Sequence, residues 1–177
     1  MQNLWWREDP QNRAYRECGS EASSGACRVV IVGGTEMGQG KVTKEVLEQL
    51  AKEHCPFLAD FGIHCEELGS GYAVVRMKYD ERYLRPGKYI TGGMLMTLAD
   101  IAIYYAILSV VGLKPMTVTN DFKMNFLRPA VGGDVLARAE VLKTGRRIVY
   151  GEIRLFMAHE PEKLIGHATS SYVLPDE

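Results

Sequence analysis

The sequence predicts an α+β domain in which an antiparallel sheet curls around one long central helix. Three observations predict it: a long apolar run at 92–111, two strand-like segments before that run, and four longer strand-like segments after it. A helix that is apolar on all sides belongs in the interior of a domain, and a curled sheet would supply its burial. Because the links between the later strands are short, we expect neighbouring strands to be antiparallel.

The segment before the apolar run is predicted to form a helix and a hairpin. Apolar residues recur at helical spacing over 43–53, which predicts an amphipathic helix. Strand-like runs at 63–68 and 72–79 flank a Gly-Ser-Gly turn and predict a β-hairpin. The apolar helix itself is expected to end at Gly112, since glycine commonly follows the last helical turn.

The segment after the apolar helix is almost entirely strand-like. Apolar and polar residues alternate along it, as in a sheet with one packed face and one wetter face. Clusters of turn residues at 129–133, 144–146 and 160–162 separate the strands. The predicted strands are 116–127, 134–143, 148–159 and 164–174.

The first forty residues differ in composition from the rest of the chain. Residues 1–40 are polar and glycine-rich, so they are predicted to form a tail or a loosely attached segment, and 41–177 to form the domain. The glycines before Lys41 suggest a phosphate-binding loop, but Thr35 and Val42 stand where that pattern needs a glycine and a hydroxyl residue. We interpret this likeness as chance.

Composition limits the expected partners and location. The 177 residues suit a single domain, and a net charge of -1 predicts no nucleic-acid partner and no membrane partner. Charged residues near the N-terminus occupy the place of a signal peptide's apolar region, so we expect a cytoplasmic protein. The four cysteines are then expected to remain thiols, and we expect no metal and no cofactor.

Asp100 is the one charged residue in the apolar run. An ionised carboxylate in an apolar environment costs several kcal/mol unless it is paired. From the residues alone, two interpretations remain open. Asp100 is either a structural acid held by nearby donors, or a carboxylate kept for chemistry.

Four short motifs occur in an order that resembles a known enzyme family. They are Gly-Gly at 92–93, Leu-Ala-Asp at 98–100, Phe-Leu-Arg-Pro-Ala-Val-Gly-Gly-Asp at 126–134 and Lys-Thr-Gly-Arg at 143–146. Together they resemble hotdog-fold thioesterases, most closely the acyl-CoA thioesterases of the phenylacetic-acid-degradation type. The resemblance spans roughly 55–174 and implies a hotdog fold.

The resemblance also implies catalytic roles. Asp100 matches the family's catalytic carboxylate, which either attacks the thioester or activates water. Gly92 matches the glycine whose backbone N–H polarises the carbonyl, and Gly93 would let substrate approach the backbone. Thr119 would orient the water. Since eight residues of helix separate Gly92 from Asp100, about 12 Å, the family pairs one subunit's glycine with the other's acid, and we expect a homodimer or a pair of such dimers.

Further residues are expected to bind substrate. Thr91 replaces the family's histidine and is predicted to cap the helix through its hydroxyl, while Arg85 replaces an amide side chain near the carbonyl. Tyr104 lies one helical turn after Asp100, so two roles stay open for it: its hydroxyl donates to the carboxylate, or its ring packs and its hydroxyl finds another partner. Arg128 and Arg146, together with Lys143 and Arg147, are candidates for binding coenzyme A phosphates.

The function implied by the resemblance is hydrolysis of an acyl-CoA or aryl-CoA thioester. Because the histidine and the amide are both replaced, an acyl-CoA-binding hotdog protein without hydrolytic activity is the alternative. A hotdog hydratase ranks last, since we find no Asp/His arrangement of the kind it requires.

Overall fold

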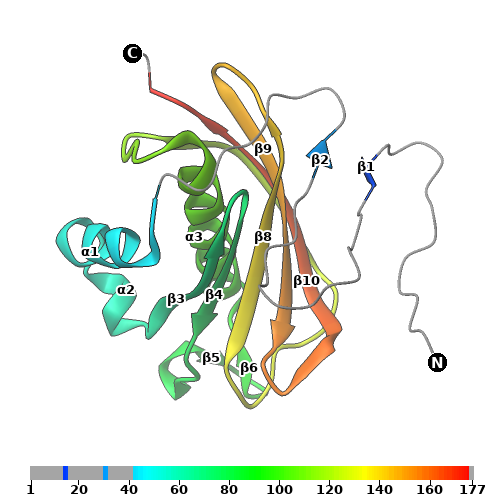
Figure 1. Cartoon of the computed structure of the whole chain (residues 1–177). Helices are drawn as coiled ribbons and strands as arrows, with labels where there is room; N and C mark the ends of the chain where they lie inside the picture. Colours follow the sequence, from blue (N-terminus) through cyan, green and yellow to red (C-terminus); the bar gives the residue numbers. More distant parts are fainter. Residues whose placement is uncertain (1–13, 16–29, 32–41, 176–177) are drawn as a thin grey trace, which may run out of the picture. The chain divides into compact units, whose positions relative to one another are not determined.

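A curled antiparallel sheet packs around one long helix. The computed structural model describes residues 14–15, 30–31 and 42–175, and in it helix α3 (Gly92–Val111) lies against a six-stranded sheet (Figure 1). The order of the strands is β3-β4-β8-β9-β10-β7, and every neighbouring pair is antiparallel. This arrangement confirms the predicted fold class. The strands are β3 (Ile63–Gly69), β4 (Tyr72–Met77), β7 (Val118–Phe126), β8 (Val135–Thr144), β9 (Ile148–Met157) and β10 (Glu160–Val173).

Helix α3 is the core helix that the sequence predicts. It contacts all six strands of the sheet, and its Leu98, Ala102 and Ile103 side chains are fully buried. A Cβ added at Gly151 on β9 would lie 2.4 Å from Cδ1 of Ile103. The same Cβ would lie 2.6 Å from the backbone oxygen of Glu140 on β8, which cannot move aside as a side chain can, so this position requires glycine. By length and composition α3 could cross a membrane, but its apolar surface is largely buried against the sheet.

Shorter elements lead into and flank the sheet. Helix α1 (Lys44–His54) begins as predicted, with the Thr43 hydroxyl accepting a hydrogen bond from the Val46 N–H at 3.4 Å. A short helix α2 (Phe57–Asp60) follows, which the sequence analysis did not predict. The 3-10 helix η1 (Glu81–Tyr83) and the small hairpin β5 (Leu84–Arg85) and β6 (Tyr89–Ile90) then deliver the chain to the start of α3.

Several strand boundaries differ from the prediction by one to four residues. Strand β7 starts at Val118 rather than at 116, and β10 starts at Glu160, inside the predicted turn at 160–162. The register between β9 and β10 shifts between Glu160 and Leu164, so the chain turns before Glu160 and then bulges. A bulge accommodates Pro161, which has no N–H to donate to a ladder.

The chain divides into two compact units, Met1–Met37 and Gly38–Glu177. In the first unit, β1 (Ala14–Tyr15) pairs antiparallel with β2 (Val30–Ile31). The rest of the predicted tail, including the glycine-rich stretch before Lys41, lies outside the described residues. The domain boundary at 40/41 therefore stays a prediction.

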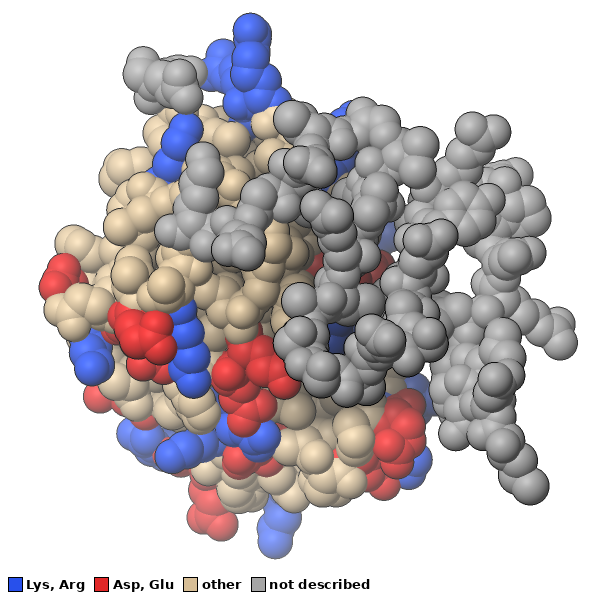
Figure 2. Space-filling model, viewed as in Figure 1, with Lys and Arg blue, Asp and Glu red and all other residues tan. Residues whose placement is uncertain are grey.

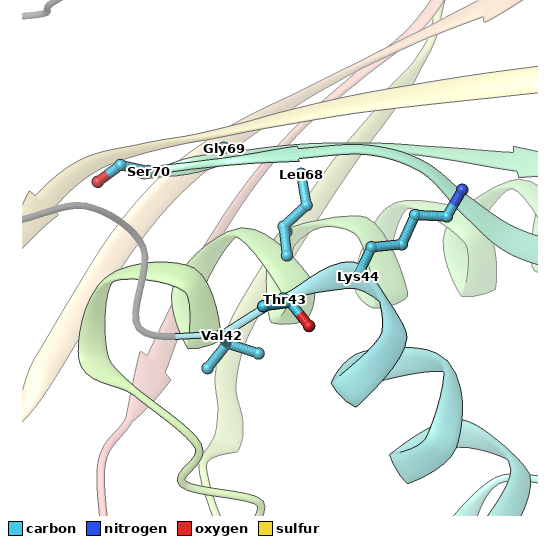
Figure 3. A pocket seen from close by; sticks show the side chains of 6 residues that line it. All are labelled: Val42, Thr43, Lys44, Leu68, Gly69 and Ser70. Atoms are coloured by element: carbon cyan, nitrogen blue, oxygen red, sulfur yellow. The ribbon is translucent and has the colours of Figure 1, made fainter.

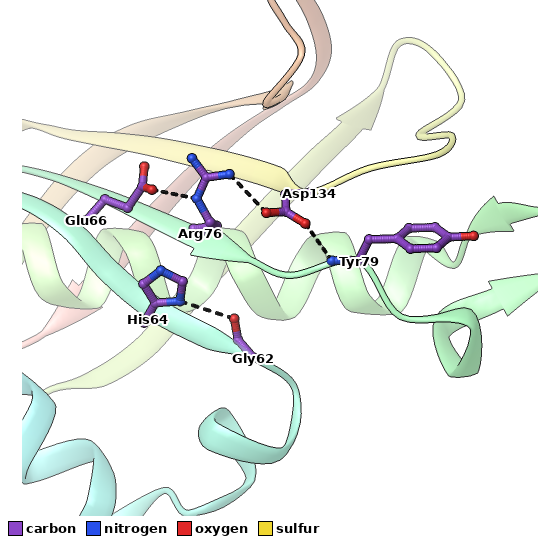
Figure 4. Close-up of polar contacts among 6 residues, drawn as sticks. All are labelled: Gly62, His64, Glu66, Arg76, Tyr79 and Asp134. Carbon is purple, nitrogen blue, oxygen red and sulfur yellow. Dashed lines mark hydrogen bonds and ion pairs between the residues drawn. The ribbon is translucent and has the colours of Figure 1, made fainter.

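Asp134 joins the ends of two strands. Its Oδ1 accepts from the Tyr79 N–H at 2.9 Å and its Oδ2 from Nη1 of Arg76 at 3.0 Å (Figure 4). Nε of Arg76 in turn donates to Glu66 at 2.5 Å. The Tyr79 N–H, and then Arg76, hold the pKa of Asp134 below its ordinary value. The last residue of the 126–134 motif thus ties β3, β4 and β8 together.

We expect Asp134→Asn to lower the free energy of unfolding by about 2 kcal/mol at pH 7, because hydrogen bonds to an ionised partner are lost. Since the folded-state pKa of Asp134 is lowered, its contribution is present above the unfolded pKa near 4 and disappears as pH falls through the folded value. Urea unfolding at pH 7 and pH 3 should show the gap closing in acid. Glu162→Gln, which alters an exposed carboxylate, is the control. Equal stability of Asp134→Asn and wild type at pH 7 would contradict this role.

Candidate active site

The N-terminus of α3 presents unpaired backbone donors. Thr91 is the N-cap residue, and its carbonyl accepts from the N–H groups of Met94 and Leu95 at 3.1 and 3.4 Å. The N–H groups of Gly92 and Gly93 lie in the first turn, where no helix carbonyl stands three or four residues earlier to accept from them, so they have no partner within the helix. The helix dipole adds a partial positive charge at this end. These two amides are suited to an oxygen that gains negative charge.

The predicted hydroxyl cap of Thr91 is wrong. The Thr91 side chain makes no capping hydrogen bond. Instead, its backbone N–H donates to the Tyr83 carbonyl at 2.9 Å, so backbone contacts alone fix the start of the helix. The donors at Gly92 and Gly93 consequently have no competing side chain from the cap position.

A pocket of about 510 Å³ opens beside Gly92. A Cβ at Gly92 would lie 3.0 Å from Cζ of Phe126, whereas a Cβ at Gly93 would meet nothing within 4 Å. The pocket brings Arg85, Gly92 and Arg128 together, three of the residues that the sequence analysis selected. Its lining is Arg85, Tyr89, Ile90, Gly92, Leu95, Phe126, Leu127, Arg128, Pro129 and Ala130.

Two hydroxyl groups converge on one oxygen of Asp100. Oγ1 of Thr119 donates to Oδ1 at 3.2 Å, and the Tyr172 hydroxyl donates to the same oxygen at 2.5 Å. None of the described residues donates a hydrogen bond to Oδ2. Oδ2 is also not one of the buried side-chain atoms without a partner, so solvent reaches it. Asp100 is half-buried. One carboxylate oxygen is therefore held in place while the other remains accessible.

Tyr172 is a site residue that the sequence analysis missed. Its side chain is 2% exposed, and its ring packs against Tyr104 with centroids 6.3 Å apart. Burial, and then the nearby Asp100 carboxylate, raise the pKa of Tyr172, so the phenol stays protonated and donates. Tyr172 on β10 pairs directly with Thr119 on β7. A correct register for these two strands was the signal that could have identified it.

Of the two roles left open for Tyr104, the structure shows packing, and the hydrogen bond to Asp100 is not formed. The Tyr104 hydroxyl donates to the Pro115 carbonyl at 3.1 Å, in the loop that follows α3. The one-turn spacing places both residues on the same side of the helix, but the Tyr104 hydroxyl is used by the loop after α3. Tyr172 makes the contact instead.

The two predicted phosphate-binding arginines lie far apart. Nη1 of Arg128 donates to the Leu164 carbonyl at 2.6 Å, and Arg128 lines the pocket beside Gly92. Arg146 lies in the turn after β8, at the other end of a ten-residue strand, and does not line that pocket. Such a strand is about 30 Å long. Only Arg128 is therefore brought to Gly92.

Within one chain, the carboxylate and the helix N-terminus form two separate half-sites. Eight residues of helix place Asp100 about 12 Å beyond Gly92, and Asp100 does not line the Gly92 pocket. A carbonyl bound at Gly92 would be out of reach of Asp100 in the same chain.

A second pocket, about 360 Å³, lies between the start of α1 and the end of β3 (Figure 3). It is lined by Val42, Thr43, Lys44, Leu68, Gly69 and Ser70, none of which the sequence analysis selected as a site residue. On the face shown in Figure 2, acidic and basic side chains are interspersed rather than gathered into a field of one sign.

Comparisons with known proteins agree on one family. Residues 87–162 match the family model described as "Thioesterase superfamily". The Pseudomonas aeruginosa protein named "Putative esterase PA0474" is 33% identical over 113 residues, which are 63% of this chain and 81% of that protein.

Solved structures show the same fold. The crystal structure of a "putative thioesterase" from Silicibacter sp. TM1040 superposes with a TM-score of 0.71 at 28% identity, covering 80% of this chain and 97% of that chain. The Escherichia coli PaaI protein from the phenylacetic acid degradation operon gives a TM-score of 0.66 at 25% identity, covering 73% and 91%.

Proposed function

The chain belongs to the thioesterase superfamily, and from this premise we propose that it hydrolyses an acyl-CoA or aryl-CoA thioester with Asp100 as the catalytic carboxylate. Family membership makes the chain a hydrolase. The observation that carries the proposal is the arrangement at Asp100, where Thr119 and Tyr172 hold Oδ1 and leave Oδ2 accessible. A structural acid would be expected to have both oxygens paired.

In the proposed reaction, the thioester carbonyl oxygen accepts hydrogen bonds at the N-terminus of α3, with the Gly92 N–H as principal donor. These donors stabilise the negative charge that develops on the oxygen as the carbonyl carbon becomes tetrahedral. Oδ2 of Asp100 either attacks that carbon or takes a proton from the water that does. If Oδ2 attacks, the C–S bond breaks to leave the acyl group on Asp100 as an anhydride, which water then hydrolyses to the free acid. If Oδ2 instead takes a proton from the attacking water, breaking of the C–S bond gives the free acid directly. In both cases the sulfur leaves as a thiol with a proton that comes from water.

We propose that a second copy of the chain completes the site. The 12 Å between Gly92 and Asp100 requires that the acid come from a neighbour. The open edge of the sheet supports this: β7 is an outer strand in the described order, and its Val118 and Phe126 are more than half exposed. Met96, on the same side of α3 as Asp100, is 40% exposed. An unpaired edge beside apolar surface favours association. Whether two such dimers pair further stays a prediction.

Acyl-CoA binding without hydrolysis is the second candidate. It is favoured by Thr91, whose side chain contributes no hydrogen bond at the helix start where the family's histidine would stand. Calorimetry that showed tight binding of a CoA ester, together with no release of free thiol, would select this function.

The remaining expectations are part of the proposal. We place the protein in the cytoplasm, supported by Cys55 and Cys65, which are both free thiols. The mixed charges and the net charge of -1 are the reason to expect neither nucleic acid nor a membrane as partner, and the proposed reaction requires no cofactor.

We expect Asp100→Asn to lower kcat/KM by about 10²–10⁴-fold, the usual contribution of a carboxylate that acts as base or nucleophile. Release of free thiol from a panel of short, long and aromatic CoA esters measures it and also identifies the acyl group. Thermal unfolding should show that the variant remains folded, since asparagine keeps the size of the side chain and an oxygen acceptor. Unchanged turnover in Asp100→Asn would remove Asp100 from the mechanism.

We expect Tyr172→Phe to lower kcat about tenfold while KM stays within about twofold, because the carboxylate loses an orienting donor but the ring still packs. Thr119→Val should act in the same way through the same oxygen. Tyr104→Phe is the matched control, since its hydroxyl donates to Pro115 instead. If Tyr172 only stabilises the fold, Tyr172→Phe should lower the unfolding temperature and leave kcat per folded molecule unchanged. That result would contradict the proposed role of Tyr172 in orienting Asp100.

A further inference from the structure

The pocket beside Gly92 carries two positive charges and no negative one. Arg85 enters it from β5 and Arg128 from the segment after β7, and no Asp or Glu lines it. Between the two arginines the lining is apolar or aromatic, with Ile90, Leu95 and Phe126 among its members. An uncharged acyl chain in this pocket would leave both guanidinium groups without an anionic partner.

Neither arginine has a carboxylate partner among the described residues. The Arg85 guanidinium lies 5.5 Å from the centroid of the Tyr89 ring, and Nη1 of Arg128 donates to the Leu164 carbonyl. These contacts orient the two side chains but leave their charges uncompensated. Planar guanidinium groups held in this way are suited to a carboxylate, which they bind through paired hydrogen bonds.

The size of the pocket limits which part of a thioester supplies the anion. A sphere of 510 Å³ is about 10 Å across, and Gly92 lies in its wall together with both arginines. In a CoA ester the arm between sulfur and the first phosphate is about 15 Å when extended, comparable to four residues of extended chain. An anion that shares this pocket with the carbonyl therefore belongs to the acyl group.

We propose that the pocket selects thioesters whose acyl group carries a second carboxylate, the half-esters of short dicarboxylic acids, with Arg85 and Arg128 binding that carboxylate. This inference rests on the proposed function, because it takes the carbonyl to be held at Gly92. It adds the class of acyl group, which the family does not fix. The arginines also offset the repulsion between the substrate's carboxylate and the negative charge that develops at Gly92.

The test compares two esters of the same shape and different charge. Glutaryl-CoA carries the terminal carboxylate, and 5-methylhexanoyl-CoA has an isopropyl group in its place. We expect wild type to favour glutaryl-CoA at least tenfold in kcat/KM, and Arg85→Gln and Arg128→Gln each to bring that ratio down about tenfold. Arg82→Gln is the control, since it removes a guanidinium from the same segment but does not line the pocket.

The outcomes of this comparison show whether the arginines bind a carboxylate of the acyl group or a phosphate of coenzyme A. A wild-type preference for the neutral ester, or an equal loss on both esters in Arg85→Gln, would overturn the proposal, the latter because Arg85 would then act on the carbonyl. With 3′-dephospho-CoA esters the preference should persist in wild type and again fall in the variants. If the arginine effect instead disappears with the phosphate, the arginines bind coenzyme A and the proposal fails.

A binding measurement keeps this proposal distinct from the proposed hydrolysis. A thioether analogue, in which a methylene group replaces the carbonyl of glutaryl-CoA, cannot be hydrolysed. Calorimetry should show that wild type binds it about tenfold more tightly than Arg85→Gln, and that Asp100→Asn binds it like wild type. If no ester is hydrolysed but this difference is found, the hydrolase proposal fails and the carboxylate pocket stands. No difference would overturn the pocket.

Discussion

The hydrogen bond from the Tyr172 hydroxyl to Oδ1 of Asp100 is the contact on which the rest of the site depends. An acid in the middle of an apolar helix needs donors, and this fold provides them from the sheet rather than from the helix itself. Tyr172 is almost fully buried on β10, and Thr119 faces it from β7, so the pairing of these two strands fixes the carboxylate. Both donors bind the same oxygen. The second oxygen, Oδ2, is therefore available to attack the substrate or to take a proton from water.

Helix α3 gives each half of the site a different property. Its N-terminus provides unpaired amides and a favourable dipole at Gly92, and its middle provides a carboxylate at Asp100. The rise of the helix keeps these two apart within one chain, while the sheet leaves β7 open along its edge. Association of two copies at that edge is the arrangement that would bring amide and acid to one substrate. The arginines at the Gly92 pocket then act on the acyl group rather than on the reacting bond.

Local patterns predicted most of the fold, whereas the site depended on pairings between distant segments. The apolar run, the helical spacing over 43–53 and the turn residues identify α3, α1 and the antiparallel strands, because these signals are local. Asp100 could be identified from the sequence because the free-energy cost of a carboxylate in an apolar helix depends on its neighbours in the chain. Tyr172 did not, since its contact with Asp100 spans 72 positions and depends on the β7–β10 register. For the same reason the sequence indicated no phenol donor other than Tyr104, one helical turn away, and could not show that Arg85 and Arg128 share a pocket while Arg146 lies elsewhere.

Complementation between two inactive subunits tests the central claim most directly. Gly92→Val would obstruct the carbonyl site beside Phe126, and Asp100→Asn would remove the acid. If amide and acid come from different chains, a mixed dimer of the two variants contains one intact site, so purified heterodimers should recover about half of the wild-type turnover per dimer. If both groups act within one chain, every site in the mixed dimer is defective. Heterodimers that stay as inactive as either parent would contradict the account.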